Sequence, residues 1–378
     1  MPGSDYTAAM GTQAATPPKL SPFDEADLRE RVQLAIDAVL GQEAARLTAI
    51  DTDLLPLVEA LTALLAGGKR LRPAFCYWGW RGALAEGQPP TELDEPAMRA
   101  AAALEFLQAC ALVHDDVMDG SDTRRGQPAA HRRFANLHRN QSWLGSPEHF
   151  GIGAAILLGD MCLSWSDQVL LTSGMPDAAI SRAKPVYDEM RTELMAGQYL
   201  DLLEQARGGG SIERALRVVR YKSAKYTIEK PLHLGAALAD APPAVFSTYT
   251  AFGLPLGEAF QLRDDILGVF GDPKETGKPA GDDLREGKRT VLIAIASQRA
   301  SSAQLSAIRT HLGDPALDLT GVEKLREIIS ATGARDHAEQ LIANLLESSL
   351  SALDTAVINP QARVIFTDLA HAATKRSV

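Results

Sequence analysis

The chain has 378 residues, of which 46% are hydrophobic and 23% are charged, so it can bury a large core in one large domain or two ordinary ones. Its formal net charge of −10 excludes an overall basic field for nucleic acid or an anionic membrane. Any polyanionic ligand must therefore be held by local basic clusters or by metal ions. Three widely spaced cysteines without a CxxC pair fit neither a disulfide framework nor a zinc site, and they suit a reducing compartment.

The N-terminal residues 1–22 are rich in Pro, Gly, Ser and Thr, which predicts a disordered tail. This segment lacks the basic start and apolar core of a signal peptide. No later segment has the roughly 18 uninterrupted apolar residues that a membrane span needs. We therefore expect a cytoplasmic protein without a membrane span.

Residues 23–378 predict a single all-α domain, because long runs rich in Ala, Leu, Glu and Arg are separated by loop signals and strand-like alternation is hard to find. Segments 97–119, 151–171 and 248–268 are apolar around much of their circumference, as expected of helices inside a large bundle. The mixed-charge segments 23–46 and 323–347 predict surface helices. The polar segment 132–150 is interpreted as a surface loop or lid.

An acidic motif appears twice, as HDDVMD at 114–119 and RDDILG at 263–268. On a helix, Asp115 and Asp119 are one turn apart and share a face, while Asp116 lies to the side. Mg²⁺ is usually held by one or two carboxylates, water and substrate phosphates. A single DDxxD group is more often a solvated helix end, but two such groups, each ending an apolar helix, favour a metal site.

Basic residues gather in short clusters near these motifs. Arginine makes forked contacts with phosphate oxygens, and lysine supplies a compact charge. Together with two acidic motifs, they are what a site for two diphosphates requires. The clusters contain Lys69, Arg70 and Arg72, then Arg124 and Arg125, then Lys222 and Lys225, and finally Lys278, Lys288 and Arg289.

In this order the motifs resemble those of the trans-isoprenyl diphosphate synthases, the family of farnesyl, geranylgeranyl and longer-chain polyprenyl synthases. The motifs are GGKRLRP, DDVMDGSDTRRG, GD at 159–160, GQYLD at 197–201, KSA at 222–224, FQLRDD at 260–265 and GKPAGDDLREGK. The resemblance implies the isoprenoid synthase fold, an all-α bundle around a deep central cavity. It also implies a homodimer that condenses isopentenyl diphosphate with an allylic diphosphate.

The resemblance also implies roles for individual residues. Asp115 and Asp119 would bind two Mg²⁺ ions, with Asp116 in support. Asp264, with Asp265 beside it, would bind a third Mg²⁺ ion. Mn²⁺ could substitute for Mg²⁺. Contacts to the allylic diphosphate would come from Arg124, Lys222, Ser223, Lys278 and Lys288. A metal-free pocket for isopentenyl diphosphate would comprise Lys69, Arg72, Gln108 and Arg125, with Gln261 between the two substrates.

Two positions depart from the family pattern. Gly268 stands where the second motif often has a third aspartate, for which Asp272 is a candidate replacement acting through water. Gln108 stands where many bacterial members have His, which keeps a polar contact but removes any charge.

The residues just upstream of Asp115 predict the product length. Cys110 and Ala111 lie about one helical turn, roughly 5.4 Å, deeper in the cavity, and bulky aromatics near these positions close the floor in farnesyl synthases. Their small side chains predict geranylgeranyl diphosphate (C20), with Phe106 and Leu107 as the floor. The alternative products are farnesyl diphosphate or a longer polyprenyl diphosphate. In another interpretation all four residues are ordinary core residues and a neighbouring helix sets the depth.

Two other functions remain open. A terpene cyclase shares the fold and a magnesium motif, but it handles one diphosphate and would have no use for the separate basic set of Lys69, Arg72 and Arg125. A non-catalytic partner subunit would not need metal ligands and diphosphate contacts together.

Overall fold

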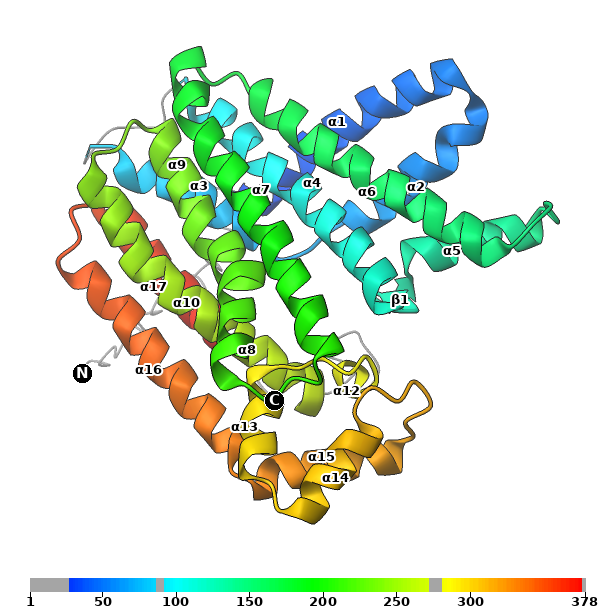
Figure 1. The fold of residues 1–378 in the computed structure, drawn as a ribbon. Helices are drawn as coiled ribbons and strands as arrows, with labels where there is room; N and C mark the ends of the chain where they lie inside the picture. The colour runs from blue at the N-terminus through cyan, green and yellow to red at the C-terminus, as the bar shows by residue number, and fades with distance from the viewer. Residues whose placement is uncertain (1–26, 86–91, 272–280, 376–378) are drawn as a thin grey trace, which may run out of the picture.

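The structure, a computed structural model, describes residues 27–85, 92–271 and 281–375. This part of the chain is almost entirely helical (Figure 1), which confirms the expected all-α fold. The predicted tail 1–22 lies outside the described residues. In chain order the helices are α1 (Leu28–Ile50), η2 (Thr52–Leu54), α2 (Leu55–Leu65), α3 (Leu71–Ala83), α4 (Asp94–Asp119), α5 (Ala130–Asn140), α6 (Pro147–Leu171), α7 (Asp177–Ala206), α8 (Ile212–Val218), η3 (Val219–Glu229), α9 (Lys230–Leu238), α10 (Pro243–Phe270), α12 (Asp282–Arg285), α13 (Val291–Arg299), α14 (Ser302–His311), α15 (Leu319–Ala331), α16 (Ala334–Asp354) and α17 (Pro360–Thr374).

Helix α4 lies in the middle of the larger hydrophobic core and packs against α6, α3 and α1. Its residues 100–103 are four fully buried alanines, whose small side chains allow neighbouring helices to approach closely. Gly120, with φ 68°, ends the helix in the left-handed region that glycine adopts without strain. The acidic motif thus occupies the last turn, where the helix dipole disfavours negative charge. Helix stability does not explain these carboxylates.

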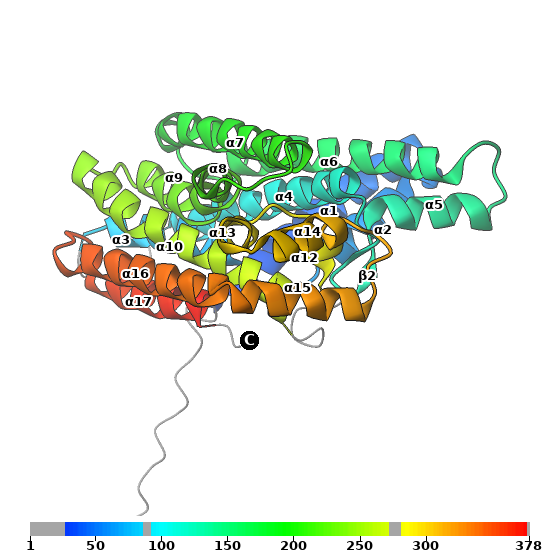
Figure 2. The same cartoon turned by 60° about the horizontal axis from the view of Figure 1, so that its bottom comes forward.

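A second, smaller core is formed by α8, α12, α13, α14 and α15 with parts of α10 and α16. Helices α13, α14 and α15 lie together at the bottom of the molecule in Figure 1, and in Figure 2 this end faces the viewer. Helices α10 and α16 contribute side chains to both cores. The second acidic motif, near the end of α10, therefore lies where the two cores meet.

The segment η3, which carries the KSA motif, is a π-helix. Its backbone is in close contact with two neighbouring helices through glycines. A Cβ on Gly197 of α7 would lie 2.4 Å from the Lys222 nitrogen, and one on Gly257 of α10 would lie 2.6 Å from the Ala224 Cα. The π-helix is thus held between α7 and α10, and π-helical turns are frequent at functional sites.

Two expectations about residues 132–171 are wrong. Residues 132–150 are mostly helical, in α5 and the start of α6, because their polar side chains form the outer face of α5 while Phe134 and His138 are buried. The two helices project from the bundle as a pair (Figure 1). Helix α6 is not buried all round, since Ile152, Ile156 and Leu157 on it are exposed.

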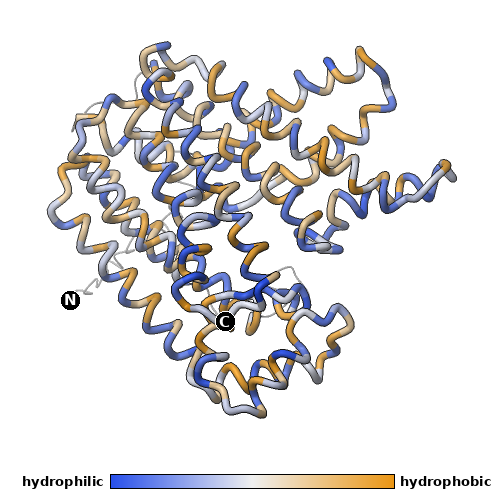
Figure 3. Tube along the Cα trace, in the orientation of Figure 1, coloured by the Kyte–Doolittle hydropathy of each residue, from blue (hydrophilic) through white to orange (hydrophobic). Residues whose placement is uncertain are grey.

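Two described helices, α4 and α6, are long and apolar enough to cross a membrane by length and composition. In this fold 78% of the most apolar window of α4 and 44% of that of α6 are buried inside the protein. Hydropathy along the chain alternates within most helices rather than forming one continuous apolar belt (Figure 3).

Candidate active site

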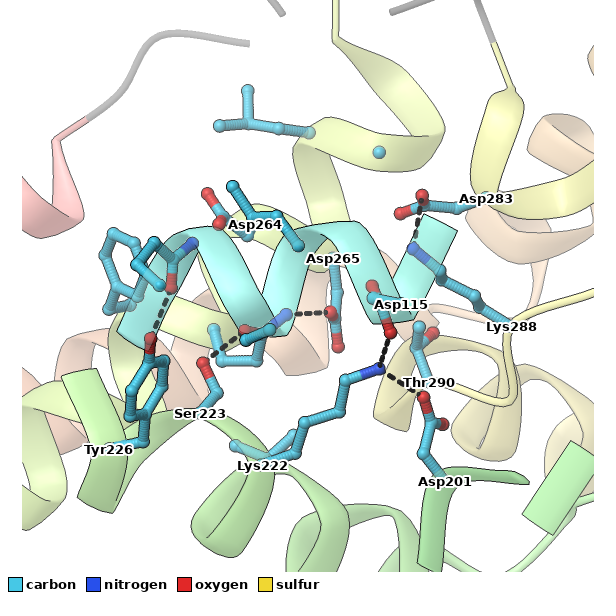
Figure 4. A pocket seen from close by; sticks show the side chains of 18 of the residues that line it. Asp115, Asp201, Lys222, Ser223, Tyr226, Asp264, Asp265, Asp283, Lys288 and Thr290 are labelled. Carbon is cyan, nitrogen blue, oxygen red and sulfur yellow. Dashed lines mark hydrogen bonds and ion pairs between the residues drawn. The ribbon is translucent and has the colours of Figure 1, made fainter. Parts of the chain in front are cut away.

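A cavity of about 820 Å³ opens between α3, α4, α7, η3 and α10, in the size range typical of small-ligand sites. Figure 4 shows that acidic and basic side chains from separate segments point into it. Of the residues singled out in the sequence, those that line it are Lys69, Arg70, Arg72, Gln108, Ala111, Asp115, Arg124, Arg125, Lys222, Ser223, Gln261, Asp264, Asp265, Lys288 and Arg289. Lys278 and Asp272 lie outside the described residues.

The first acidic motif meets the π-helix through Lys222. The Lys222 ammonium group donates to Asp115 Oδ1 at 3.0 Å and to Asp201 Oδ2 at 2.6 Å (Figure 4). Gln198 Nε2 also donates to Asp115 Oδ1, at 2.8 Å. Helices α4, α7 and η3 therefore converge on one carboxylate of the motif.

The other two carboxylates of this motif have different surroundings. Asp116 is buried and accepts from Arg124 Nε at 2.9 and 3.2 Å. The side chain of Asp119 is 2% exposed, and its Oδ2 lies 4.0 Å from Lys288 Nζ. Neither residue is among those that line the cavity.

A tight hairpin brings Arg124 and Arg125 to the cavity. Strand β1 (Thr123–Arg124) pairs with β2 (Gln127–Pro128), and the connecting Arg125 and Gly126 have φ 52° and 73°. Positive φ at both central residues is typical of a two-residue hairpin turn. Arg125 thereby points toward α2 and donates to the Leu64 carbonyl at 2.8 Å.

The second acidic motif is connected to the π-helix by Gln261. Ser223 Oγ donates to Gln261 Oε1, and Gln261 Nε2 donates to Asp265 Oδ1 at 2.9 Å. Asp264 and Asp265 both line the cavity. A serine at 223 therefore orients the amide of Gln261 toward the second motif.

A separate basic region lies around Arg72. The guanidinium carbon of Arg72 is 4.3 Å from the centre of the Tyr226 ring, and its Nη2 donates to Thr227 Oγ1 at 2.9 Å. The Tyr226 hydroxyl donates to Gln108 Oε1 at 2.7 Å. Stacking and hydrogen bonds thus fix Arg72 and Gln108, and Lys69 and Arg125 line the same cavity.

A family model described as polyprenyl synthetase matches residues 56–329 of the chain. The chain is 31% identical to geranylgeranyl diphosphate synthase of Mycobacterium tuberculosis over 300 residues, which cover 79% of this chain and 78% of that protein. It is also 31% identical to heptaprenyl diphosphate synthase component 2 of Geobacillus stearothermophilus, covering 90% of this chain and 95% of that protein.

A crystal structure of geranylgeranyl pyrophosphate synthase from Corynebacterium glutamicum, complexed with isoprenyl diphosphate and magnesium, matches with a TM-score of 0.89 and 42% identity, covering 95% of this chain and 100% of that one. The chain belongs to the polyprenyl synthetase family. It is therefore a prenyltransferase with the isoprenoid synthase fold.

Lysines and carboxylates in the cavity of this polyprenyl synthetase shift one another's pKa values. Burial alone would raise the pKa of Asp115, but Lys222 and Lys288 outweigh burial and lower it. Burial and the charge of Asp115 raise the pKa of Asp119 to about 6. Burial, with the charges of Asp283 and Asp264, raises the pKa of Asp265 to about 7. Two carboxyl groups in this site thus favour a nearby positive charge.

The donor set of this polyprenyl synthetase fits a hard divalent cation. Asp119 Oδ1 and Asp265 Oδ2 are buried oxygens without a hydrogen-bond partner among the described residues. No group of three Asp, Glu, His or Cys side chains converges as a ready-made metal site in the described part of the chain. Mg²⁺ is usually held by one or two carboxylates, with water and substrate phosphate completing its coordination.

Sequence reasoning missed several residues at the site. Gln198 and Asp201 contact Asp115 or Lys222. Tyr226 holds Arg72 and Gln108, as described above, and Asp283 contacts Lys288 at 3.4 Å. Gln198, Asp201 and Asp283 belong to motifs that the sequence analysis names, and this membership could have identified them as site residues. The position of Tyr226 follows from the π-helix, which the sequence pattern does not reveal.

The four residues proposed to set chain length occupy different places. Ala111 lines the cavity, as do the apolar residues Leu194 and Phe260. Cys110 is buried, with its Sγ 3.8 Å from His114 Nδ1. Phe106 packs edge to face against Trp165 of α6 at 6.5 Å, and Leu107 is buried in the core. Among the four, Ala111 is the one that faces the cavity.

Proposed function

We propose that this polyprenyl synthetase condenses isopentenyl diphosphate head-to-tail with dimethylallyl, geranyl and farnesyl diphosphates, releasing pyrophosphate and making mainly geranylgeranyl diphosphate. The observation that carries this proposal is that one cavity is lined both by carboxylates of the two acidic motifs and by basic side chains from other segments. The carboxylates include Asp115 and Asp264, and the basic side chains include Lys69, Arg72 and Arg125. Two diphosphates that must react differently need two such sets of side chains.

The basic region suits the diphosphate that stays bonded. Isopentenyl diphosphate would be gripped by Lys69, Arg72 and Arg125, with Gln108 as a neutral contact. Arg72 is already held against Tyr226 and Thr227, so little side-chain freedom is lost when it binds phosphate.

The acidic motifs suit the diphosphate that leaves. Arg124, Lys222 and Lys288 would contact the allylic diphosphate and stabilise its growing charge as the C1–oxygen bond breaks. About three Mg²⁺ ions would supply further positive charge as the pyrophosphate leaves, and Mn²⁺ could replace them. These ions would be held by Asp115, Asp119 and Asp264, with Asp116 and Asp265 in support.

The bond changes then balance without a protein base. The C4 carbon of isopentenyl diphosphate bonds to C1 of the allylic chain, while the electron pair of the C1–oxygen bond leaves on pyrophosphate. A proton from C2 of the isopentenyl unit passes to that released pyrophosphate. Apolar lining residues such as Ala111, Leu194 and Phe260 would keep water from the allylic cation.

The test is pyrophosphate release by the purified chain. A synthase requires isopentenyl diphosphate and an allylic diphosphate together, a terpene cyclase requires the allylic diphosphate alone, and a non-catalytic partner subunit releases none. A terpene cyclase binds one diphosphate and would not need the basic region around Arg72. A non-catalytic partner subunit would not need candidate metal ligands and basic side chains in the same cavity.

The product length rests on Ala111. A methyl group at this lining position leaves room past the reacting carbons, which supports C20 rather than C15. Relatives named for geranylgeranyl and for heptaprenyl products share similar identity with this chain, so product analysis by chain length is the deciding experiment.

We further propose that the enzyme is a cytoplasmic homodimer. Exposed apolar side chains on neighbouring helices α6 and α7 support a subunit interface there, because monomers rarely leave such patches uncovered. They include Ile152, Ile156, Leu157, Met195 and Tyr199. The molar mass in solution, measured by light scattering, tests this assignment.

A further inference from the structure

Gly268, where the second acidic motif lacks a third carboxylate, has another side chain next to it. Position 268 is one helical turn after Asp264 on the same face of α10, as Asp119 is after Asp115 on α4. A Cβ placed on Gly268 would lie 1.8 Å from Asp283 Oδ2 and 2.6 Å from its Cγ. The carboxylate of Asp283 thus fills the space in which a side chain at position 268 would begin.

Asp283 reaches this place from α12, fifteen residues along the chain. Side chains one turn apart on a helix have Cβ atoms about 5–6 Å apart, so the Asp283 carboxylate lies at about that distance from the Cβ of Asp264. Both residues line the cavity (Figure 4). The absence of a side chain at Gly268 is therefore what allows Asp283 to approach α10.

Two further carboxylates indicate that a cation belongs here. Asp265 is 6% exposed, and its Oδ2 has no hydrogen-bond partner among the described residues although Oδ1 accepts from Gln261. The side chain of Asp119, whose Oδ2 lies 4.0 Å from Lys288 Nζ, is 2% exposed, and its Oδ1 is likewise unpartnered in the described part of the chain. Buried carboxylate oxygens without partners are costly unless a ligand satisfies them.

We propose that Asp283 supplies the third carboxylate of the second acidic motif, in place of the side chain missing at Gly268, and binds a divalent cation together with Asp264. The cation would bridge these carboxylates to a diphosphate oxygen. This inference rests on the proposed function, because the diphosphate completes the coordination. It also explains why glycine is required at 268, where any side chain would displace Asp283.

The other reading of Asp283 is that it only positions Lys288, whose Nζ lies 3.4 Å from its Oδ1. Glu286 contacts the same Nζ at 2.9 Å, so Lys288 keeps a partner when Asp283 is neutralised. Loss of Asp283 should therefore weaken metal binding more than binding of pyrophosphate alone.

The test measures Mn²⁺ binding to the full chain in the presence of inorganic pyrophosphate, from the electron paramagnetic resonance signal of free Mn²⁺. Asp283→Asn keeps the shape of the side chain and removes its charge. Because one charge-assisted contact is lost, binding of at least one Mn²⁺ ion should weaken by about tenfold to a hundredfold. Gly268→Ala should have a similar effect because its methyl group pushes Asp283 away. Asp354→Asn, on the exposed end of α16, is the control for net charge.

A pair of double variants separates a carboxylate role from a packing role. Asp283→Ala with Gly268→Asp returns a carboxylate to the helix and should recover most of the Mn²⁺ affinity. Asp283→Ala with Gly268→Ala relieves the same contact without a charge and should not. Equal Mn²⁺ binding by these two variants, or wild-type binding by folded Asp283→Asn, would overturn the inference while leaving the proposed function intact. No Mn²⁺ binding by the wild type with pyrophosphate would overturn the proposed metal-dependent function itself.

Discussion

Replacing Lys222 by Met should separate the structural contribution of its ion pairs from their contribution to catalysis. Its ammonium group contacts Asp115 Oδ1 at 3.0 Å and Asp201 Oδ2 at 2.6 Å, so these oxygens lie no more than about 5.6 Å apart. The repulsion between these two carboxylates is about 3 kcal/mol at an effective dielectric constant of about 20, and without the ammonium group it is no longer offset. With an unfolding entropy of about 2.1 cal/mol/K per residue over roughly 350 residues, this lowers Tm by about 4 °C.

The effect should depend on pH with a defined sign. In the wild type the pKa of Asp115 is lowered, so its stabilising contribution is present above the ordinary carboxyl pKa and is lost as pH falls. In Lys222→Met the lysine charge that lowers the pKa of Asp115 is gone, so the stability deficit is largest near pH 8 and shrinks on acidification. Thermal unfolding of both proteins between pH 5 and 8 measures this difference.

The matched control is Lys225→Met on the same π-helix. Lys225 also pairs with two carboxylates, Glu193 at 2.7 Å and Glu229 at 3.6 Å, but it does not line the cavity. Both variants should lose stability, whereas only Lys222→Met should lower kcat with the allylic substrate, by about one to two orders of magnitude. Unchanged Tm and kcat in Lys222→Met would refute the assignment of Lys222 to both roles.

Four other substitutions test the remaining parts of the site. Asp115→Ala should lower turnover by orders of magnitude with an unchanged far-UV circular dichroism spectrum, and substantial activity of the wild type in excess EDTA would contradict the metal assignment. Arg125→Ala should raise KM for isopentenyl diphosphate by about tenfold to a hundredfold, with little change for the allylic substrate. Ala111→Phe should shift the product toward C15, as measured by chromatography. Cys110→Tyr should shift it less, because Cys110 faces His114. If Ala111→Phe still makes C20, the residues that limit chain length lie on another helix.

The fold class and most cavity residues could be predicted because they depend on local patterns. An apolar run that ends in carboxylates, such as 97–119, gives both the buried helix and the motif at its end. Where the prediction failed, local polarity was a poor guide. The polar segment 132–150 is an amphipathic pair of helices, since a few residues such as Phe134 are enough to bury one face. In α6, apolar side chains such as Leu157 face outward, which composition alone does not show.

What the sequence could not predict are contacts set by the absence of side chains. Gly197 and Gly257 let α7 and α10 touch the backbone of the π-helix, and this contact turns Lys222 and Ser223 toward the cavity. Gly268 likewise admits Asp283. In the sequence, each glycine appears only as a position without a side chain. At position 268, the glycine looks like the loss of a metal ligand. In three dimensions each one decides which backbone or carboxylate can come close, so the glycines of this site determine its chemistry as much as its charged residues do.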